Sequence, residues 1–188
     1  MTTRTSVQKH PSDHAETCRP HVSTLDRCSR ATVRPVLRLL SEILTYPQTD
    51  LPEKVASCVT LLSKVDSDAT ALLERFCAFA AETPSGRLEE AYTSAFDLQA
   101  VCCPYVGYQI FGDSYKRGLF LAHLKDEYRN GGFAIGAELG NELPDHLAVI
   151  LRFLAVLDDA GSADELVAHC LVPALGKMVS AVDDSGNP

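Results

Sequence analysis

The sequence lacks several features that would each indicate a class of protein. Its longest apolar run, residues 147–157, is interrupted by Arg152 and falls short of the roughly 20 residues that a membrane helix requires. The first 30 residues contain no apolar segment of the kind that a secretory signal needs. Basic residues are in the minority, with 17 lysines and arginines against 25 aspartates and glutamates. The formal charge of −8 disfavours binding to nucleic acid or to an anionic membrane, so we expect a soluble, cytoplasmic protein without stable membrane association.

Sequence motifs of catalysis and nucleotide binding are also missing. No Gly-x-Ser-x-Gly elbow is present, and the glycine-rich stretch after residue 130 lacks the Gly-Lys-Ser/Thr ending that holds phosphate. No stretch alternates apolar and polar residues in the way that a half-buried strand does. The seven cysteines cannot all pair and fall mostly within apolar helical patterns, which indicates a reducing compartment.

Helical periodicity dominates what is present. Apolar residues recur at helical spacing, as in Val36, Leu40 and Ile43, and the chain is long enough for one domain with its own core. We therefore predict an all-α, single-domain helical bundle of about seven or eight helices. The expected boundary signals are Pro47 after the first helix, Pro52 in the first turn of the second, Ser67 capping a third that ends near Thr83, a fourth from Ser85, Asp113 capping a helix that ends before Gly131, Asp145 capping one that ends at Gly161, and Ser162 with Glu165 as a capping box.

The two ends of the chain differ in composition from its middle. Residues 1–30 are rich in Thr, Ser, His and Pro and carry five basic and three acidic residues, so we predict a disordered polar tail. Residues 31–182 form the predicted helical domain, and residues 183–188 are expected to be a frayed end. Within the domain, the four glycines between residues 131 and 144 predict a real loop.

Two segments are poorly explained by core packing alone. Residues 92–117 contain four of the six tyrosines, whose polar tips suit a binding surface. Residues 142–147 place Glu142, Asp145 and His146 at a helix start, where capping accounts for Asp145 but not for the other two. A pair of carboxylates is a good receiver for a guanidinium group.

Thiol or metal chemistry is the alternative that the residues leave open. The adjacent Cys102 and Cys103 could bind a soft metal or act as a redox sensor if they are ionised and exposed. Their apolar neighbours favour core packing instead. A second group lies in the predicted tail but fits no strong zinc spacing: His10, His14, Cys18, His21 and Cys28.

An ordered set of short motifs resembles the NarJ/TorD-type family of molybdoenzyme maturation chaperones. The resemblance covers roughly residues 36–179 and leaves the tail out. Its motifs are Leu44-Thr45-Tyr46-Pro47, Tyr92 with Phe96-Asp97, Cys103-Pro104-Tyr105, Gly112-Asp113 with Arg117-Gly118, and Glu142-Leu143-Pro144-Asp145-His146-Leu147. The order Leu143-Pro144-Asp145-His146 is closer to the nitrate reductase delta-subunit branch than to the branch that serves trimethylamine N-oxide reductase.

The resemblance implies an all-α chaperone that has no catalysis and no cofactor of its own. Its partner would be the catalytic subunit of a molybdopterin oxidoreductase, whose amino-terminal leader it binds while the cofactor is inserted, and it would act as a monomer or an exchangeable dimer. Leader recognition in the family carries over to Glu142, Pro144, Asp145 and His146 and to the aromatic residues Tyr92, Phe96, Tyr105 and Tyr108. Such leaders join basic residues to an apolar stretch, so an acidic rim beside aromatic rings would suit them.

Overall fold

The computed structural model describes residues 27–97, 102–136 and 142–185, and within these ranges all regular elements are helical. The predicted tail lies almost entirely outside the described residues, as do four of its five candidate metal ligands. The helices are α1 (Arg27–Ile43), α2 (Leu51–Leu62), α3 (Ser67–Glu82), α4 (Ser85–Phe96), α5 (Val106–Phe111), α6 (Tyr115–Asn130), α7 (Leu147–Val156), α8 (Ala160–Leu166) and α9 (Val172–Ser185), with a π-helical turn at Val167–Leu171. The π-helical turn joins α8 and α9 into one segment, so the described residues form eight helical segments. The predicted all-α fold is confirmed.

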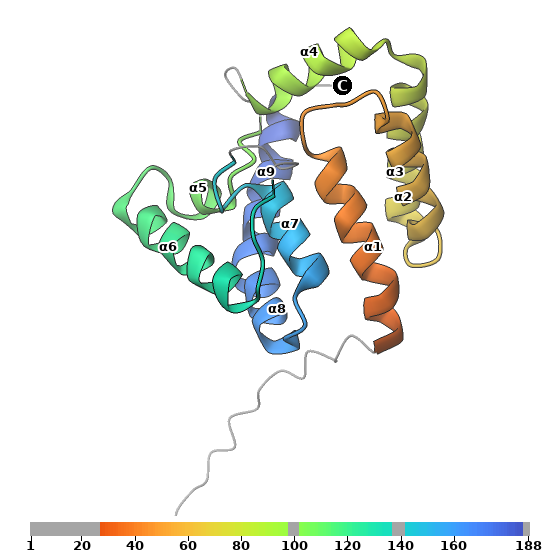
Figure 1. The fold of residues 1–188 in the computed structure, drawn as a ribbon. Coiled ribbons are helices and arrows are strands. Elements are labelled where there is room, and N and C mark those ends of the chain that lie inside the picture. The colour runs from red at the N-terminus through yellow and green to blue at the C-terminus, as the bar shows by residue number, and fades with distance from the viewer. Residues whose placement is uncertain (1–26, 98–101, 137–141, 186–188) are drawn as a thin grey trace, which may run out of the picture.

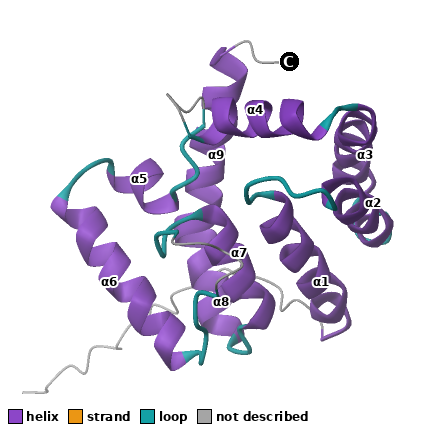
Figure 2. Ribbon diagram, turned by 45° about the horizontal axis from the view of Figure 1, so that its top comes forward, coloured by secondary structure: helices purple, strands orange, loops and turns teal. Residues whose placement is uncertain are grey.

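Helix α7 is the centre of the main core. Seven of its ten residues are buried, and its sequence is apolar on nearly every side, which is typical of a helix surrounded by others. Figures 1 and 2 show α1 beside α7, with the α8 and α9 segment behind it and α6 farther out. The aromatic rings of Tyr128, Phe133 and Phe153 close the α6 side of this core, with centroids 4.6 to 5.6 Å apart.

A smaller core lies on the other side of α1. Leu51, Val55, Ala80 and Leu88 are buried there, where α2, α3 and α4 meet. Figure 2 shows α2 and α3 side by side and α4 reaching back from them above α7 and α1. This arrangement places the end of α1, the start of α2 and the side of α4 around one space.

Several helix ends differ from the sequence prediction because a neighbouring side chain makes the capping bond. Asp66, and not Ser67, caps α3 through two backbone N–H groups at 2.9 Å. His146, and not Asp145, caps α7, which ends at Val156 and not at Gly161. The predicted capping box of Ser162 and Glu165 is wrong, since Asp159 caps α8 and also accepts a bond from the Ser162 hydroxyl.

The predicted starts of α2 and α4 are confirmed, with Pro52 in the first turn of α2 and Ser85 as the first residue of α4. The cap predicted at Asp113 is wrong: Ser114 is the residue before α6, and its side chain makes no capping bond. The described parts of the predicted loop, residues 131–136 and 142–144, are not helical.

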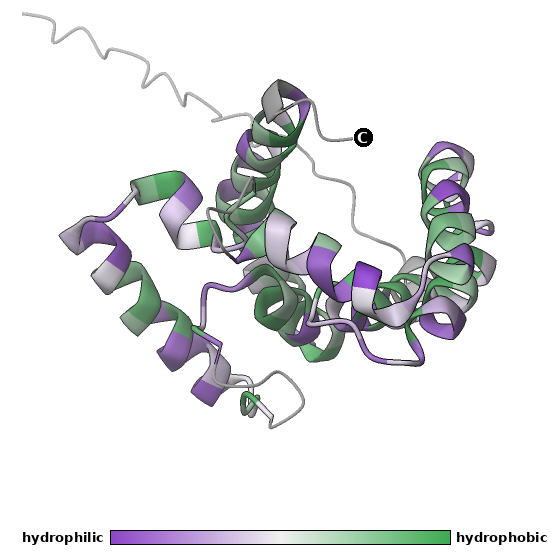
Figure 3. Cartoon of the chain, turned by 90° about the horizontal axis from the view of Figure 1, so that it is seen from above, coloured by the Kyte–Doolittle hydropathy of each residue, from purple (hydrophilic) through white to green (hydrophobic). Residues whose placement is uncertain are grey.

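The segment formed by α8, the π turn and α9 has a longer apolar stretch than the sequence prediction recognised. Residues Ala160–Asp183 are long and apolar enough to cross a membrane by length and composition alone, and 17% of the apolar window is buried. Figure 3 shows hydrophobic colouring along the helix that ends at the C-terminus. This segment also contributes Leu171, Ala174 and Met178 to the main core, and Lys177 Nζ donates to the Gln109 carbonyl on α5.

Candidate functional site

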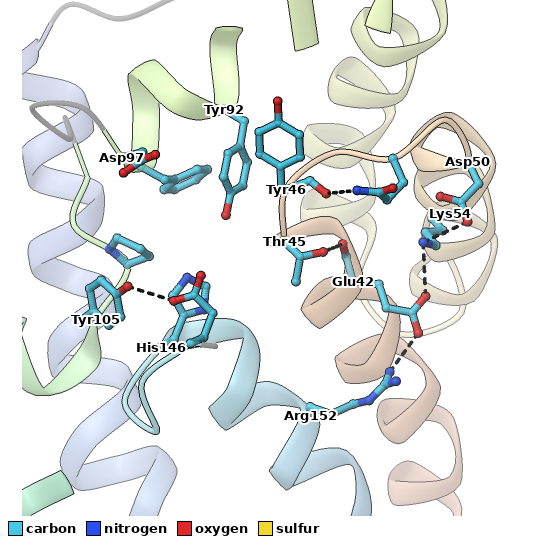
Figure 4. A pocket seen from close by; sticks show the side chains of 14 residues that line it. Glu42, Thr45, Tyr46, Asp50, Lys54, Tyr92, Asp97, Tyr105, His146 and Arg152 are labelled. Atoms are coloured by element: carbon cyan, nitrogen blue, oxygen red, sulfur yellow. Dashed lines mark hydrogen bonds and ion pairs between the residues drawn. The ribbon is translucent and has the colours of Figure 1, made fainter. Parts of the chain in front are cut away.

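A cavity of about 810 Å³ opens between the end of α1, the start of α2, the side of α4, residues 104–105, the segment before α7 and Arg152 of α7. Figure 4 shows side chains from all of these elements pointing into it. Five of the eight predicted site residues line the cavity: Tyr92, Phe96, Tyr105, Glu142 and His146. The residues that the prediction did not include are Glu42, Thr45, Tyr46, Gln48, Asp50, Lys54, Asp97, Pro104 and Arg152.

An aromatic wall covers the α4 side of the cavity. Tyr92 and Phe96 are four residues apart on α4, so their rings lie on one helix face with centroids 5.1 Å apart. Tyr46 completes the wall from the α1–α2 connection, with its ring edge-on to Tyr92 at 5.6 Å. Burial, and then the nearby carboxylates of Glu142 and Asp97, raise the pKa of Tyr92 to about 12. The wall is therefore apolar in its body and neutral at its tips at physiological pH.

Tyr105 and Glu142 form a polar pair on the adjoining side. The Tyr105 hydroxyl donates a 2.9 Å hydrogen bond to Glu142 Oε2, and burial together with this bond raises the pKa of Tyr105. Backbone bonds hold the two segments together, from Val106 N to the Asp145 carbonyl at 2.8 Å and from Leu147 N to the Pro104 carbonyl at 2.9 Å. Because the pair is fixed by backbone as well as side chain, the Glu142 carboxylate has a defined place at the cavity.

Three predicted site residues, Tyr108, Pro144 and Asp145, do not line the cavity. The Asp145 side chain is fully buried and accepts two bonds from Arg117, from Nε at 2.9 Å and from Nη2 at 3.3 Å. The Arg117 guanidinium lies over the rings of Tyr105 and Tyr108, 5.3 and 5.7 Å from their centroids. Asp145 is therefore placed to position Tyr105 through Arg117, and its carboxylate already holds a guanidinium group.

Tyr108 and Pro144 have different surroundings. The Tyr108 side chain is partly exposed on α5, outside the cavity. Pro144 is buried, and its carbonyl accepts a 2.7 Å bond from the Tyr128 hydroxyl, which ties the segment before α7 to α6.

His146 joins the cavity to the start of α7. Its Nδ1 accepts the Ala148 N–H at 3.2 Å, and its ring meets the Tyr105 ring edge-on at 5.2 Å. Burial lowers the pKa of His146, although the nearby carboxylates of Glu142 and Asp145 act in the opposite direction. A protonated ring could not accept the Ala148 bond, so the cap requires the neutral form.

This cap predicts a pH dependence of stability. Below the ordinary histidine pKa of about 6.5 the unfolded chain binds a proton at residue 146 that the folded chain does not, so acidification from pH 7 to pH 5 lowers the free energy of unfolding. We expect the His146→Asn variant, which keeps a good N-cap but does not titrate, to lose less stability over the same range. Urea unfolding of both proteins at several pH values measures this, and equal slopes would contradict it.

The α1 and α2 side of the cavity carries paired charges. Glu42 accepts bonds from Arg152 Nη1 at 2.8 Å and from Arg38 Nε at 3.3 Å, and Lys54 Nζ lies 3.9 Å from its other oxygen. Burial acts to raise the pKa of Glu42, but together these cations outweigh it and hold the pKa below its usual value. Lys54 also pairs with Asp50 at 2.9 Å.

Thiol chemistry receives little support from the surroundings of Cys102. Its side chain is buried, and burial raises the pKa of the thiol, which disfavours the reactive thiolate. Within the described ranges, no group of three or more His, Cys, Asp or Glu side chains is arranged to hold a metal ion.

Comparisons with known proteins identify the family and similar proteins. The sequence model of the family described as "Nitrate reductase delta subunit" matches residues 62–177. A Bacillus subtilis protein named as a nitrate reductase molybdenum cofactor assembly chaperone, NarJ, is 30% identical over 121 residues, which are 63% of this chain and 64% of that protein. The nitrate reductase-like protein NarX of Mycobacterium tuberculosis is 28% identical over 154 residues, 81% of this chain but 22% of that protein. The chain thus covers less than two thirds of the length of these curated relatives.

A solved structure shares the fold. It is the crystal structure of a protein from Archaeoglobus fulgidus that is described as a redox enzyme maturation protein. The two chains superpose with a TM-score of 0.55 over 82% of this chain and 85% of that one, at 22% sequence identity.

Proposed function

This chain belongs to the nitrate reductase delta-subunit family, and on that premise we propose that it is an assembly chaperone for a molybdenum-dependent nitrate reductase or a related oxidoreductase. It binds the amino-terminal leader of the catalytic subunit, performs no catalysis itself, and releases the subunit after cofactor insertion. Such a step precedes export or membrane attachment, so the site of action is the cytoplasm. Residues 31–182 form the chaperone domain, and the protein acts as a monomer or an exchangeable dimer.

The observation that carries this proposal is that one cavity holds aromatic rings beside a carboxylate with which no lysine or arginine in the described part of the chain forms an ion pair. Tyr92 and Phe96 offer apolar surface, and Glu142 lies beside them, held by Tyr105. A leader with basic and apolar side chains finds a partner for each kind of group there. The names of the similar Bacillus and Archaeoglobus proteins support the same role.

We expect the Glu142→Gln variant to bind such a leader about tenfold more weakly, because it loses a charge-assisted bond and keeps the Tyr105 contact. Fluorescence anisotropy with a labelled synthetic leader of the nitrate reductase catalytic subunit from the same genome measures the affinity. Glu74→Gln, an exposed change on α3 outside the cavity, is the matched control. Equal affinity of the Glu142 and Glu74 variants would overturn the assignment of Glu142, and no binding by any of the proteins would overturn the proposed function.

A further inference from the structure

The charges around the cavity are unevenly balanced. Of the residues that line it, four are acidic and two are basic, and both basic residues lie on the α1 and α2 side (Figure 4). On that side Arg152 and Lys54 bond or approach Glu42, and Lys54 pairs with Asp50. Arg38, which does not line the cavity, also donates to Glu42, so both carboxylates on this side are fully neutralised.

The opposite side holds the uncompensated charge. Glu142 receives the neutral Tyr105 hydroxyl, and among the described residues no lysine or arginine forms an ion pair with either Glu142 or Asp97. Tyr92 is close enough to Glu142 and Asp97 for both carboxylates to raise the pKa of its hydroxyl. Figure 4 shows the side chain of Tyr92 on α4 and that of Asp97 at the end of the same helix. A cation placed there meets negative charge beside the aromatic side chains of Tyr92 and Tyr105.

The ion pairs on the α1 and α2 side are partly buried, which strengthens them. The side chains of Glu42 and Lys54 are each 25% exposed and that of Arg152 is 15% exposed, so their attraction is screened less than that of a surface pair. A cationic ligand group that approached Glu42 would have to compete with three cations already in place: Arg38, Lys54 and Arg152.

We propose that Lys54 and Arg152 determine the orientation of a bound peptide, because they help to neutralise Glu42 and Asp50. Among the described residues, this leaves Glu142 and Asp97 as the acidic side chains of the cavity that no lysine or arginine pairs. A bound peptide is then held in one orientation, with its basic end beside Glu142 and Asp97 and its apolar part along the aromatic wall of Tyr46, Tyr92 and Phe96. This inference rests on the proposed leader-binding function and adds the direction in which the leader lies in the cavity.

The test uses three synthetic peptides that share one apolar sequence: one without arginine, one with an arginine pair at one end, and one with a pair at each end. For the unmodified protein we expect the first pair to tighten binding about tenfold and the second pair to add less than about twofold. In the Lys54→Met variant Glu42 keeps Arg38 and Arg152, but Asp50 loses its ion-pair partner. The second arginine pair can then bind Asp50 and should add about fivefold. Lys54→Gln provides a second variant, and circular dichroism checks that each protein is folded.

Lys64→Met is the matched control, because it removes the same charge from an exposed position outside the cavity. A gain from the second arginine pair in the Lys54 variants but not in the Lys64 variant supports the inference. If the peptides bind and the Lys54 variants gain no more than the Lys64 variant, the inference is wrong while the proposed function stands. If no peptide binds the unmodified protein, both are wrong.

Discussion

Replacing Asp145 by alanine is expected to lower the free energy of unfolding by about 3 kcal/mol, because it removes one partner of a buried ion pair. The Asp145 side chain is fully buried and accepts two hydrogen bonds from Arg117. The Arg117 side chain is 17% exposed. Without the carboxylate, the guanidinium keeps its place over two tyrosine rings but loses its counter-charge. Urea unfolding measures the loss, and a fall in Tm of roughly 10 °C should accompany it.

The matched control is Asp126→Ala, which removes the acid of an exposed pair with Arg129. Its side chain is 61% exposed, so we expect almost no change in stability. The double variant Asp145→Leu with Arg117→Met should lose less than the sum of the two single changes, because it leaves no charge unpaired. If Asp145→Ala were as stable as Asp126→Ala, the ion pair would have no structural role.

The fold could largely be predicted from the sequence, whereas the residues that cap the helices could not. Periodic apolar residues and prolines located α2 and α4 because those signals are local. Helix α7 was predicted to end at Gly161 because glycine commonly ends a helix, but the chain leaves the helix after Val156 and Asp159 caps a new one. Capping by Asp66, His146 and Asp159 depends on which of several adjacent polar side chains turns toward free N–H groups. Sequence spacing does not decide that.

The site was predicted in part, and the part that was missed involves contacts between distant residues. Tyr92, Phe96 and Glu142 stand in motifs that carry a family resemblance. Glu42 and Arg152 are 110 residues apart, and nothing in either local sequence indicates that they meet. The same is true of the pair formed by Arg117 and Asp145, which are 28 residues apart. The predicted contact of Asp145 with a leader stays a prediction.

Substitution of Gly107 is expected to have the second large effect on stability, because there is no room beside it for a methyl group. A Cβ at this position in α5 would lie 2.7 Å from Asp145 Oδ2 and 2.8 Å from Phe120 Cδ1. Asp145 is held by Arg117, and the Phe120 ring packs against Phe111 at 5.6 Å, so neither neighbour moves without breaking other contacts. We therefore expect Gly107→Ala to lower the free energy of unfolding by about 2 kcal/mol, despite the better helix propensity of alanine.

The comparison with Gly118→Ala separates crowding from propensity. Gly118 lies inside α6, and a Cβ there would meet nothing within 4 Å. Alanine at this position should stabilise the protein by up to about 1 kcal/mol, since only the conformational gain remains. Urea unfolding should thus give opposite signs for two identical substitutions in neighbouring helices. The methyl group at position 107 would push on the Asp145 carboxylate, which holds Arg117 against Tyr105. Gly107→Ala should therefore also weaken leader binding, whereas Gly118→Ala should not. If both substitutions stabilised the protein, the residues around Gly107 would have room to relax, and the expected clash would be wrong.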